Sequence, residues 1–411
     1  MSLKQLTNIL IISILSISCS GQEPQPVQSK KIEVIATKPL KERSIVVGAE
    51  RINIYLKELE GKKVGIVANH TSMIKNTHLV DSLVNLNINV VRVFSPEHGF
   101  RGNADAGEKV NSNIDKKTGI SIISLYGKNK KPTPEQINDL DILIFDIQDV
   151  GARFYTYIST MHYVMEACAE NNKKLIILDR PNPNGHYVDG PILEDAHKSF
   201  VGMHPVPIVH GMTIGEYAKM INGEGWLDKK VKCDLTVVKS ENYTHNKHYM
   251  LPIKPSPNLP NMSSIYLYPS LCLFEGTPIS VGRGTDKPFQ VLGHPKMTSD
   301  RYSFTPKSMA GAKKPKLMGE KCNGYNLAFF GTEYMKGKGT INLFWLIEIY
   351  TNFQEKEGFF TDMFTLLAGT EKLQQQIETG KTEKEIHASW QAGITQFKQT
   401  RQQYLLYKDF E

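Results

Sequence analysis

The sequence predicts an α/β fold, in which a doubly wound, mostly parallel sheet is followed by a second, smaller α+β domain. Two observations predict it. In the first half of the 411-residue chain, continuous apolar runs of strand length alternate with segments of helical period, as in a parallel sheet covered on both faces. Beyond about residue 198, loops rich in proline and glycine precede a series of helices. Two cores are also expected because single cores stop growing at roughly 250–300 residues.

The sheet domain is expected at residues 44–198. Its strands are short apolar runs, and its helices repeat apolar residues three and four positions apart. We expect strands at 63–68, 89–94, 121–125, 141–146 and 174–178, and helices at about 79–84, 134–140 and 155–171.

The second domain is expected at residues 199–411, with loops that face the edge of the first. It opens with a helix and a strand, continues through proline- and glycine-rich loops, and ends in helices. We expect the first helix at 213–222, the strand at 234–238, loops at 254–260, 274–277 and 280–285, and helices at 341–353, 371–378, 382–390 and 391–406.

A short apolar run at residues 6–17 has the shape of a secretory signal. It is shorter than the roughly 20 residues of a membrane-spanning helix. It ends in Ser16-Ile-Ser-Cys19, which resembles the lipobox of bacterial lipoproteins, where the cysteine receives a lipid. Ser16 stands where leucine is usual, so cleavage by an ordinary signal peptidase remains the alternative. We expect an exported protein of the cell envelope, with a lipid on Cys19 as its only membrane anchor.

Residues 20–43 are rich in Gln, Pro, Lys and Glu and low in apolar side chains, which predicts a flexible tether. The formal net charge of +7 comes from dispersed lysines, so no nucleic-acid partner is expected. Neither GxGxxG after the first strand nor GxxxxGK[ST] occurs, which argues against a nucleotide cofactor. No CxxC, HxH or HExxH spacing indicates a metal. The pairing of Cys168, Cys233, Cys272 and Cys322 is left open.

Polar residues gather where the expected strands end. In open parallel sheets, ligands bind in the crevice outside the carboxyl ends of the strands. Four strand ends therefore predict one shared site: Asn69-His-Thr-Ser72, Ser95-Pro-Glu-His98, Asp146-Ile-Gln-Asp149 with Arg153, and Asp179-Arg-Pro-Asn182.

Glu97 is the leading catalytic candidate at this edge. A partly apolar position beside Phe94 and Phe100 favours the protonated carboxyl that a general acid needs. The alternative is a surface acid that pairs with Arg101. His98 is interpreted as an orienting group, a base or a metal ligand.

The other polar residues at the strand ends each have two interpretations. Asp146 and Asp149 either face the ligand or cap the following helix. Asp179 and Asn182 either form the turn that the neighbouring prolines require or bind sugar hydroxyls. Thr213 and Glu216 have the spacing of a capping box, and Glu216 becomes a second carboxylate of the site only if that helix start faces the cleft.

Arg283 stands between two glycines, on a loop suited to close approach of a ligand, and its planar fork suits a carboxylate. Asn258 and Glu275 lie in similar loops. The full set of residues expected to contact the substrate is Asn69, His98, Gln148, Arg153, Tyr155, Asp179, Asn182, Asn258, Glu275 and Arg283.

Six segments in the same order resemble the exo-β-N-acetylmuramidases of the NamZ type, which are peptidoglycan hexosaminidases. The resemblance covers roughly residues 45–410. The segments are SPEHGFRG (95–102), FDIQDVGARFYTY (145–157), LDRPNP (178–183), HGMTIGE (210–216), SPNLP (256–260) and FEGTPISVGRGT (274–285).

This resemblance implies a Rossmann-like N-terminal domain, a smaller C-terminal domain and a site in the cleft between them. It also implies release of non-reducing terminal N-acetylmuramic acid (MurNAc) from peptidoglycan fragments such as MurNAc-GlcNAc, without a cofactor. Glu97 corresponds to the motif acid expected to be catalytic, and Glu216 to a second motif glutamate at the cleft.

We hypothesise that Glu97 protonates the glycosidic oxygen, while Glu216 or Asp149 activates water or stabilises the transition state. The 2-acetamido group of the sugar is the alternative nucleophile. Arg283 and Arg153 are the candidate cations for the lactyl carboxylate of MurNAc. An alternative from another class is a catalytically silent lipoprotein that binds muropeptide or glycan. An amidase or esterase is disfavoured because no GxSxG elbow is present.

Overall fold

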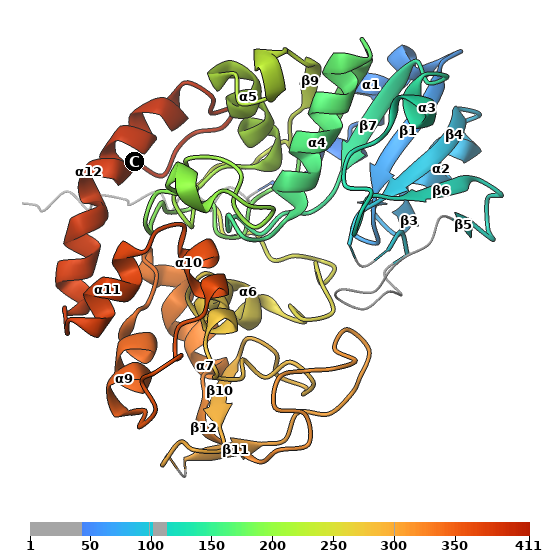
Figure 1. Ribbon diagram of the computed structural model, residues 1–411. Helices are drawn as coiled ribbons and strands as arrows, with labels where there is room; N and C mark the ends of the chain where they lie inside the picture. Colours follow the sequence, from blue (N-terminus) through green and yellow to red (C-terminus); the bar gives the residue numbers. More distant parts are fainter. Residues whose placement is uncertain (1–42, 98, 102–112, 300) are drawn as a thin grey trace, which may run out of the picture. The chain divides into compact units, whose positions relative to one another are not determined.

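A parallel β-sheet forms the first part of the structure, a computed structural model that describes residues 43–97, 99–101, 113–299 and 301–411 (Figure 1). Six strands lie parallel in the order β6-β4-β1-β7-β8-β9, and the short β5 pairs antiparallel with β6. Along the chain this is the order 3-2-1-4-5-6 of a Rossmann-like, doubly wound fold, so the predicted fold class is confirmed. The strands are β1 (Lys63–Ala68), β4 (Asn89–Ser95), β5 (Asn113–Ile114), β6 (Ser121–Ser124), β7 (Ile142–Asp146), β8 (Lys174–Leu178) and β9 (Asp234–Val238).

Both faces of this sheet are buried. In β7, Leu143 and Phe145 belong to one hydrophobic cluster, whereas Ile142 and Ile144 belong to another. Successive side chains of a strand point to opposite faces, so each strand contributes to both cores. This is why the strands read as unbroken apolar runs instead of alternating patterns.

Five α-helices and a two-stranded ribbon accompany the sheet. The helix expected from residue 155 begins at Tyr157, and the expected short helix begins at Pro134 behind a Thr133–Gln136 capping box. The helices are α1 (Ile52–Leu59), α2 (Leu79–Asn85), α3 (Pro134–Ile137), α4 (Tyr157–Glu170) and α5 (Ile214–Glu224), and the ribbon pairs β2 (Met73–Ile74) with β3 (Thr77–His78). Three-residue 3-10 helices are η1 (Gly48–Glu50), η2 (Asp195–His197) and η3 (Asp228–Lys230).

The last parallel strand, β9, pairs with β8 along its whole length. It comes after residue 198, where we expected the first domain to end. The sheet continues to Val238, so the sheet domain extends beyond residue 198. The loop-rich sequence that begins there is a long connection within this domain.

The remaining residues form an α+β part, as predicted. Three short strands make an antiparallel sheet in the order β10-β12-β11. They are β10 (Val291–His294), β11 (Tyr302–Phe304) and β12 (Cys322–Asn326). The helices are α6 (Met262–Leu271), the 3-10 helix η4 (Cys272–Gly276), α7 (Ala328–Phe330), the π-helix η5 (Gly331–Met335), α8 (Lys336–Lys338), α9 (Phe344–Asn352), α10 (Asp362–Ala368), α11 (Lys372–Glu378) and α12 (Glu383–Gln402).

Two of the expected helices are one. The segments predicted at 382–390 and 391–406 form the single helix α12, which starts with a Thr382–Glu385 capping box. The buried residues Trp390, Ile394 and Phe397 continue one apolar stripe across the predicted break. Among the described residues, no helix is long and apolar enough to cross a membrane.

Buried polar contacts join the C-terminal residues to the sheet domain. The Tyr407 hydroxyl donates to Asp179 Oδ2 at 2.6 Å, and the Leu406 amide donates to Glu216 Oε1 at 2.8 Å. The Arg401 guanidinium donates to the Gly211 carbonyl at 3.1 and 2.7 Å. These contacts hold the end of α12 and the residues after it against α5 and the segments at residues 179 and 211.

Candidate active site

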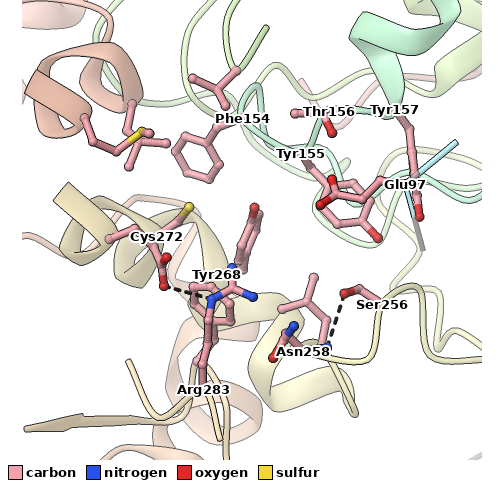
Figure 2. Close-up of a pocket in the computed structure, with 16 residues that line it drawn as sticks. Glu97, Phe154, Tyr155, Thr156, Tyr157, Ser256, Asn258, Tyr268, Cys272 and Arg283 are labelled. Carbon is pink, nitrogen blue, oxygen red and sulfur yellow. Dashed lines mark hydrogen bonds and ion pairs between the residues drawn. The ribbon is translucent and has the colours of Figure 1, made fainter. Parts of the chain in front are cut away.

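A pocket of about 270 Å³ lies between the carboxyl edge of the sheet and the second part of the chain (Figure 2). This is the edge at which doubly wound sheets bind their ligands. The lining residues from the first part are Glu97, Phe154, Tyr155, Thr156, Tyr157 and Val201. Those from the second part are Ser256, Asn258, Leu259, Tyr268, Cys272, Glu275, Arg283, Phe289, Met363 and Leu367.

Glu97 reaches this pocket from a turn just after β4. The Gly99 amide donates to the Pro96 carbonyl at 3.2 Å, and Gly99 has a φ of 77°, which glycine adopts without strain. The side chain is half-buried, and the Tyr126 hydroxyl and Tyr157 lie near its carboxyl. The alternative partner, Arg101, binds elsewhere. Its guanidinium pairs with Asp81 at 3.0 Å and Asp115 at 2.7 Å.

The opposite wall carries a cation. Arg283 Nε donates to Glu275 Oε1 at 3.0 Å, and the guanidinium lies 4.8 Å from the centre of the Phe289 ring. Burial lowers the pKa of Arg283, but the Glu275 carboxylate more than offsets this effect, so the pKa is raised overall. Gly282 has a φ of 79°, and a Cβ there would lie 2.4 Å from Val291. Gly282 therefore lets this loop pack closely against the protein's own strand β10, whereas we expected the glycines to allow close approach of a ligand.

Aromatic rings form the walls between these charges. Tyr155 meets Tyr157 edge to face at 4.9 Å and Tyr268 at 5.8 Å, and Phe154 meets Tyr268 at 5.3 Å. The Tyr155 hydroxyl donates to the Pro255 carbonyl at 2.8 Å, which fixes its ring. Such walls are rigid and offer apolar faces to a ligand. Figure 2 shows Glu97 with Tyr155 and Tyr157 on one side and Arg283 with Asn258 on the other.

Five of the predicted site residues therefore line the pocket. They are Glu97, Tyr155, Asn258, Glu275 and Arg283. Asn258 is held by a hydrogen bond from its Nδ2 to the Gly311 carbonyl at 2.8 Å. His98 and Cys19 lie outside the described residues.

Arg153 is not in the pocket, where we expected it to contact the substrate. Its side chain is fully buried and donates to four carbonyls: Pro191 at 3.0 Å, Val206 at 2.7 Å, Leu367 at 3.0 Å and Ala368 at 2.7 Å. The guanidinium thus joins the sheet domain to α10, and both of its Nη groups are occupied. Of the two predicted cations, Arg283 lines the pocket and Arg153 does not.

Glu216 is a helix cap. It forms the predicted capping box, with the Thr213 amide donating to Oε2 at 2.9 Å. His245 Nε2 lies 3.1 Å from Oε1, to which the Leu406 amide also donates. The side chain is fully buried and does not line the pocket. The condition set for a catalytic Glu216, a helix start that faces the cleft, is not met in this geometry.

Asp149 lies behind the aromatic wall, fully buried and outside the pocket lining. Its Oδ2 accepts the Gly151 amide at 2.6 Å and lies 3.9 Å from His210 Nε2. Its Oδ1 has no hydrogen-bond partner among the described residues. Burial raises the pKa of Asp149 to about 7. The Asp149 carboxyl therefore stays protonated up to about pH 7.

The remaining predicted residues shape the strand ends. Gln148 Nε2 donates to the Asp149 and Pro181 carbonyls, both at 2.8 Å. Asp179 accepts hydrogen bonds from Thr213, Gly215 and Tyr407, and Asn182 Nδ2 donates to the Met212 carbonyl at 2.9 Å. Asn69 Oδ1 accepts the Thr71 amide at 2.9 Å. These four polar side chains stabilise turns and do not line the pocket.

Several lining residues were missed by the sequence reasoning. Tyr157 stands two positions after Tyr155 in the same polar stretch, so the stretch itself was the signal. No sequence signal pointed to Tyr268 or Phe289, because an aromatic residue in an apolar or loop segment usually packs in the hydrophobic core. Tyr157 is almost fully buried, and its hydroxyl lies close to Asn69 and Tyr155.

Within the residues that the structure describes, the site offers neither a metal centre nor a nucleophilic thiolate. No group of three or more His, Cys, Asp or Glu side chains within the described ranges is arranged to hold a metal ion. Cys272 lines the pocket, but burial, reinforced by Glu275, raises the pKa of its thiol to about 12, so it is not a thiolate near neutral pH. Cys168, Cys233, Cys272 and Cys322 are all free thiols.

Fold and site together define an α/β protein with an aromatic-walled pocket at the sheet edge, where the Glu97 carboxyl lies on one wall and the Arg283–Glu275 ion pair on the other. Comparison with known proteins identifies the family. Residues 64–263 match the family model "Exo-beta-N-acetylmuramidase NamZ, N-terminal", and residues 266–407 match "Exo-beta-N-acetylmuramidase NamZ, C-terminal". The chain belongs to this family, as its motifs indicated.

Individual relatives agree with this assignment. The peptidoglycan beta-N-acetylmuramidase NamZ of Bacillus subtilis is 42% identical over 374 residues, which cover 86% of this chain and 89% of that protein. Crystal structures of two DUF1343 family proteins from Bacteroides fragilis are similar. The first has a TM-score of 0.84 and 52% identity over 89% of this chain and 100% of its own. The second has a TM-score of 0.76 and 31% identity over 89% and 99%.

Proposed function

We propose that this protein is a glycosidase that releases terminal, non-reducing MurNAc from peptidoglycan fragments of the MurNAc-GlcNAc type. Family membership and the B. subtilis relative support the reaction class. The observation that carries the proposal is the position of Glu97 and Arg283 on opposite walls of one pocket. Its volume, about 270 Å³, is just below the usual range of ligand pockets, which suits a single terminal sugar.

Glu97 is the general acid of this proposal. It donates its proton to the glycosidic oxygen as the bond to the anomeric carbon breaks and the electron pair moves to that oxygen. Arg283 receives the lactyl carboxylate, which distinguishes MurNAc from GlcNAc.

The nucleophile is proposed to be the sugar's own 2-acetamido group. Asp149 and Glu216, the expected second carboxylates, are buried outside the pocket, and Glu275 is paired with Arg283. Substrate assistance of this kind is an established exception to the two-carboxylate scheme. It needs no movement of either buried acid. Turnover retained by the Asp149→Asn variant supports this route, and complete loss in a folded variant argues for a second carboxylate instead.

A chromogenic N-acetylmuraminide tests the activity. The wild-type chain should release the chromophore, and Glu97→Gln, which keeps shape but cannot donate a carboxyl proton, should lose at least about 100-fold in kcat. Unchanged melting temperature establishes that the variant is folded. Turnover that survives in Glu97→Gln contradicts the assignment of the acid. Binding without turnover by the wild-type chain indicates the silent glycan-binding lipoprotein.

We also propose export to the cell envelope and lipidation at Cys19, on the evidence of the lipobox-like segment. Metabolic labelling with an alkyne fatty acid should mark the wild-type chain and not Cys19→Ser. Equal labelling of both chains contradicts this proposal.

A further inference from the structure

The register of two parallel strands brings a tyrosine beside Glu97. Ser95 of β4 pairs with Ser124 of β6, and the pairing continues one residue further, where the Leu125 amide donates to the Ser95 carbonyl at 2.8 Å. Glu97 and Tyr126 each stand two residues beyond the paired serines. Both chains leave the same edge of the sheet, so the two side chains start from equivalent positions in neighbouring turns.

The two side chains meet at their polar ends. The Tyr126 hydroxyl is part-buried beside the Glu97 carboxyl, and the causes of its raised pKa are burial, then the charge of Glu97, then a hydrogen bond between the two groups. The pKa of Tyr126 is raised to about 12. The phenol therefore keeps its proton at any working pH and acts as a hydrogen-bond donor to the carboxylate. Such contacts commonly shorten when the substrate binds.

Tyr126 does not itself line the pocket. It can act on a bound sugar only through Glu97. On the other side, Tyr157 also lies near the Glu97 carboxyl, but its hydroxyl hydrogen-bonds with Asn69 and Tyr155 and interacts with Glu97 only through charge. Of these two phenols, Tyr126 is the one in a position to orient the acid.

We propose that Tyr126 is a positioning residue that orients Glu97 and stabilises its carboxylate while the proton passes to the glycosidic oxygen. The inference rests on the proposed function. Tyr126 keeps its own proton throughout. Its hydrogen bond strengthens as negative charge develops on Glu97, so it stabilises the transition state more than the ground state.

The experiment is Tyr126→Phe, assayed with the chromogenic muraminide across the pH range. Hydrogen bonds to charged groups contribute about 1.5–3 kcal/mol, so kcat should fall roughly 10- to 100-fold, while KM changes less than about twofold. A donor to the charged form favours ionisation. Its removal should therefore move the alkaline limb of the pH–rate profile to higher pH. A purely structural role lowers the melting temperature without moving that limb.

The chain offers a matched control. The Tyr404 hydroxyl donates to Glu224 Oε1 at 2.6 Å, and burial and that carboxylate raise the pKa of Tyr404 to about 12 as well. This phenol–carboxylate pair is outside the pocket. Tyr404→Phe should leave kcat and the pH–rate profile unchanged. If both variants shift the profile alike, the effect is general and the inference fails.

A second variant covers the case in which Tyr126→Phe does not fold. Site-specific 3-fluorotyrosine at position 126 keeps the shape and is a stronger donor, so the alkaline limb should move to lower pH. Wild-type kinetics in either folded variant overturn the positioning role while leaving the proposed function intact. An inactive wild-type chain overturns both.

Discussion

Replacing Arg283 with glutamine should remove the preference of the pocket for MurNAc over GlcNAc. The two sugars differ only in the lactyl ether and its carboxylate. Arg283 Nε is held by Glu275, and neither of its Nη groups makes a hydrogen bond with the residues that the structure describes. The fork is therefore open to one carboxylate, and glutamine keeps hydrogen-bonding capacity while removing the charge.

The expected loss of MurNAc affinity depends on how far the Arg283–Glu275 pair is exposed to solvent. The Arg283 and Glu275 side chains are each 28% exposed, so solvent screens the ligand contact in part. A hydrogen bond to a charged group contributes about 1.5–3 kcal/mol. With screening, the lower end of that range applies, which corresponds to a roughly 10-fold loss of MurNAc affinity.

Calorimetric binding of free MurNAc and free GlcNAc measures this contribution directly. Wild-type protein should bind MurNAc about 10-fold more tightly, and Arg283→Gln should bind both sugars alike. Glu275→Gln is the matched control, because it removes the internal partner and leaves the cation. The double variant Arg283→Gln/Glu275→Gln removes both charges without leaving Glu275 unpaired. An equal loss for both sugars in Arg283→Gln shows that the loop, and not the charge, was affected, and refutes the reasoning.

Two further predictions concern buried groups. Burial raises the pKa of Asp149 to about 7. Between about pH 4 and pH 7 the folded chain therefore keeps a proton that the unfolded chain has released. The free energy of unfolding should fall as the pH rises through this range. Asp149→Asn should therefore unfold at higher urea than the wild type at pH 8 but not at pH 4, while turnover is kept; the opposite order contradicts the burial argument. Arg153→Lys should lose about 3 kcal/mol or more in denaturant titrations, because one ammonium cannot satisfy four buried carbonyls. Lys372→Met, which removes a 75%-exposed partner of Glu194, should leave the denaturation midpoint nearly unchanged because exposed ion pairs contribute little, and a similar loss in both variants contradicts the role given to Arg153.

The sequence was sufficient to predict the central strands β1, β4, β7 and β8 because most of their side chains are buried. The apolar runs ending at Ala68, Phe94, Asp146 and Leu178 then follow from packing alone. The last strand, β9, has only Val238 buried, and we had placed it in the second domain. The antiparallel strands β10, β11 and β12 were not predicted, since they are three to five residues long within loops rich in glycine and proline. Short-range pattern carries little signal at that length.

The site was predictable only in part, and Glu97 and Arg153 show why. Glu97 ends an apolar strand with a turn that needs no acid, so function was the simpler interpretation. Arg153 looked equally functional, but two of its four acceptors, Leu367 and Ala368, lie 214 and 215 positions away. An arginine fork suits carbonyl pairs as well as carboxylates. No local pattern distinguishes these uses, whereas the capping box of Glu216 was readable because its partner is three residues away.

The contacts of residues 406 and 407 with the sheet domain have a consequence for biosynthesis. Leu406 and Tyr407 meet Glu216 and Asp179 across 190 and 228 positions. On the ribosome, the two acids emerge long before their partners have been translated. Glu216 and Asp179 therefore acquire these hydrogen bonds only after residues 406 and 407 have been translated, and until then both buried acids lack these native partners.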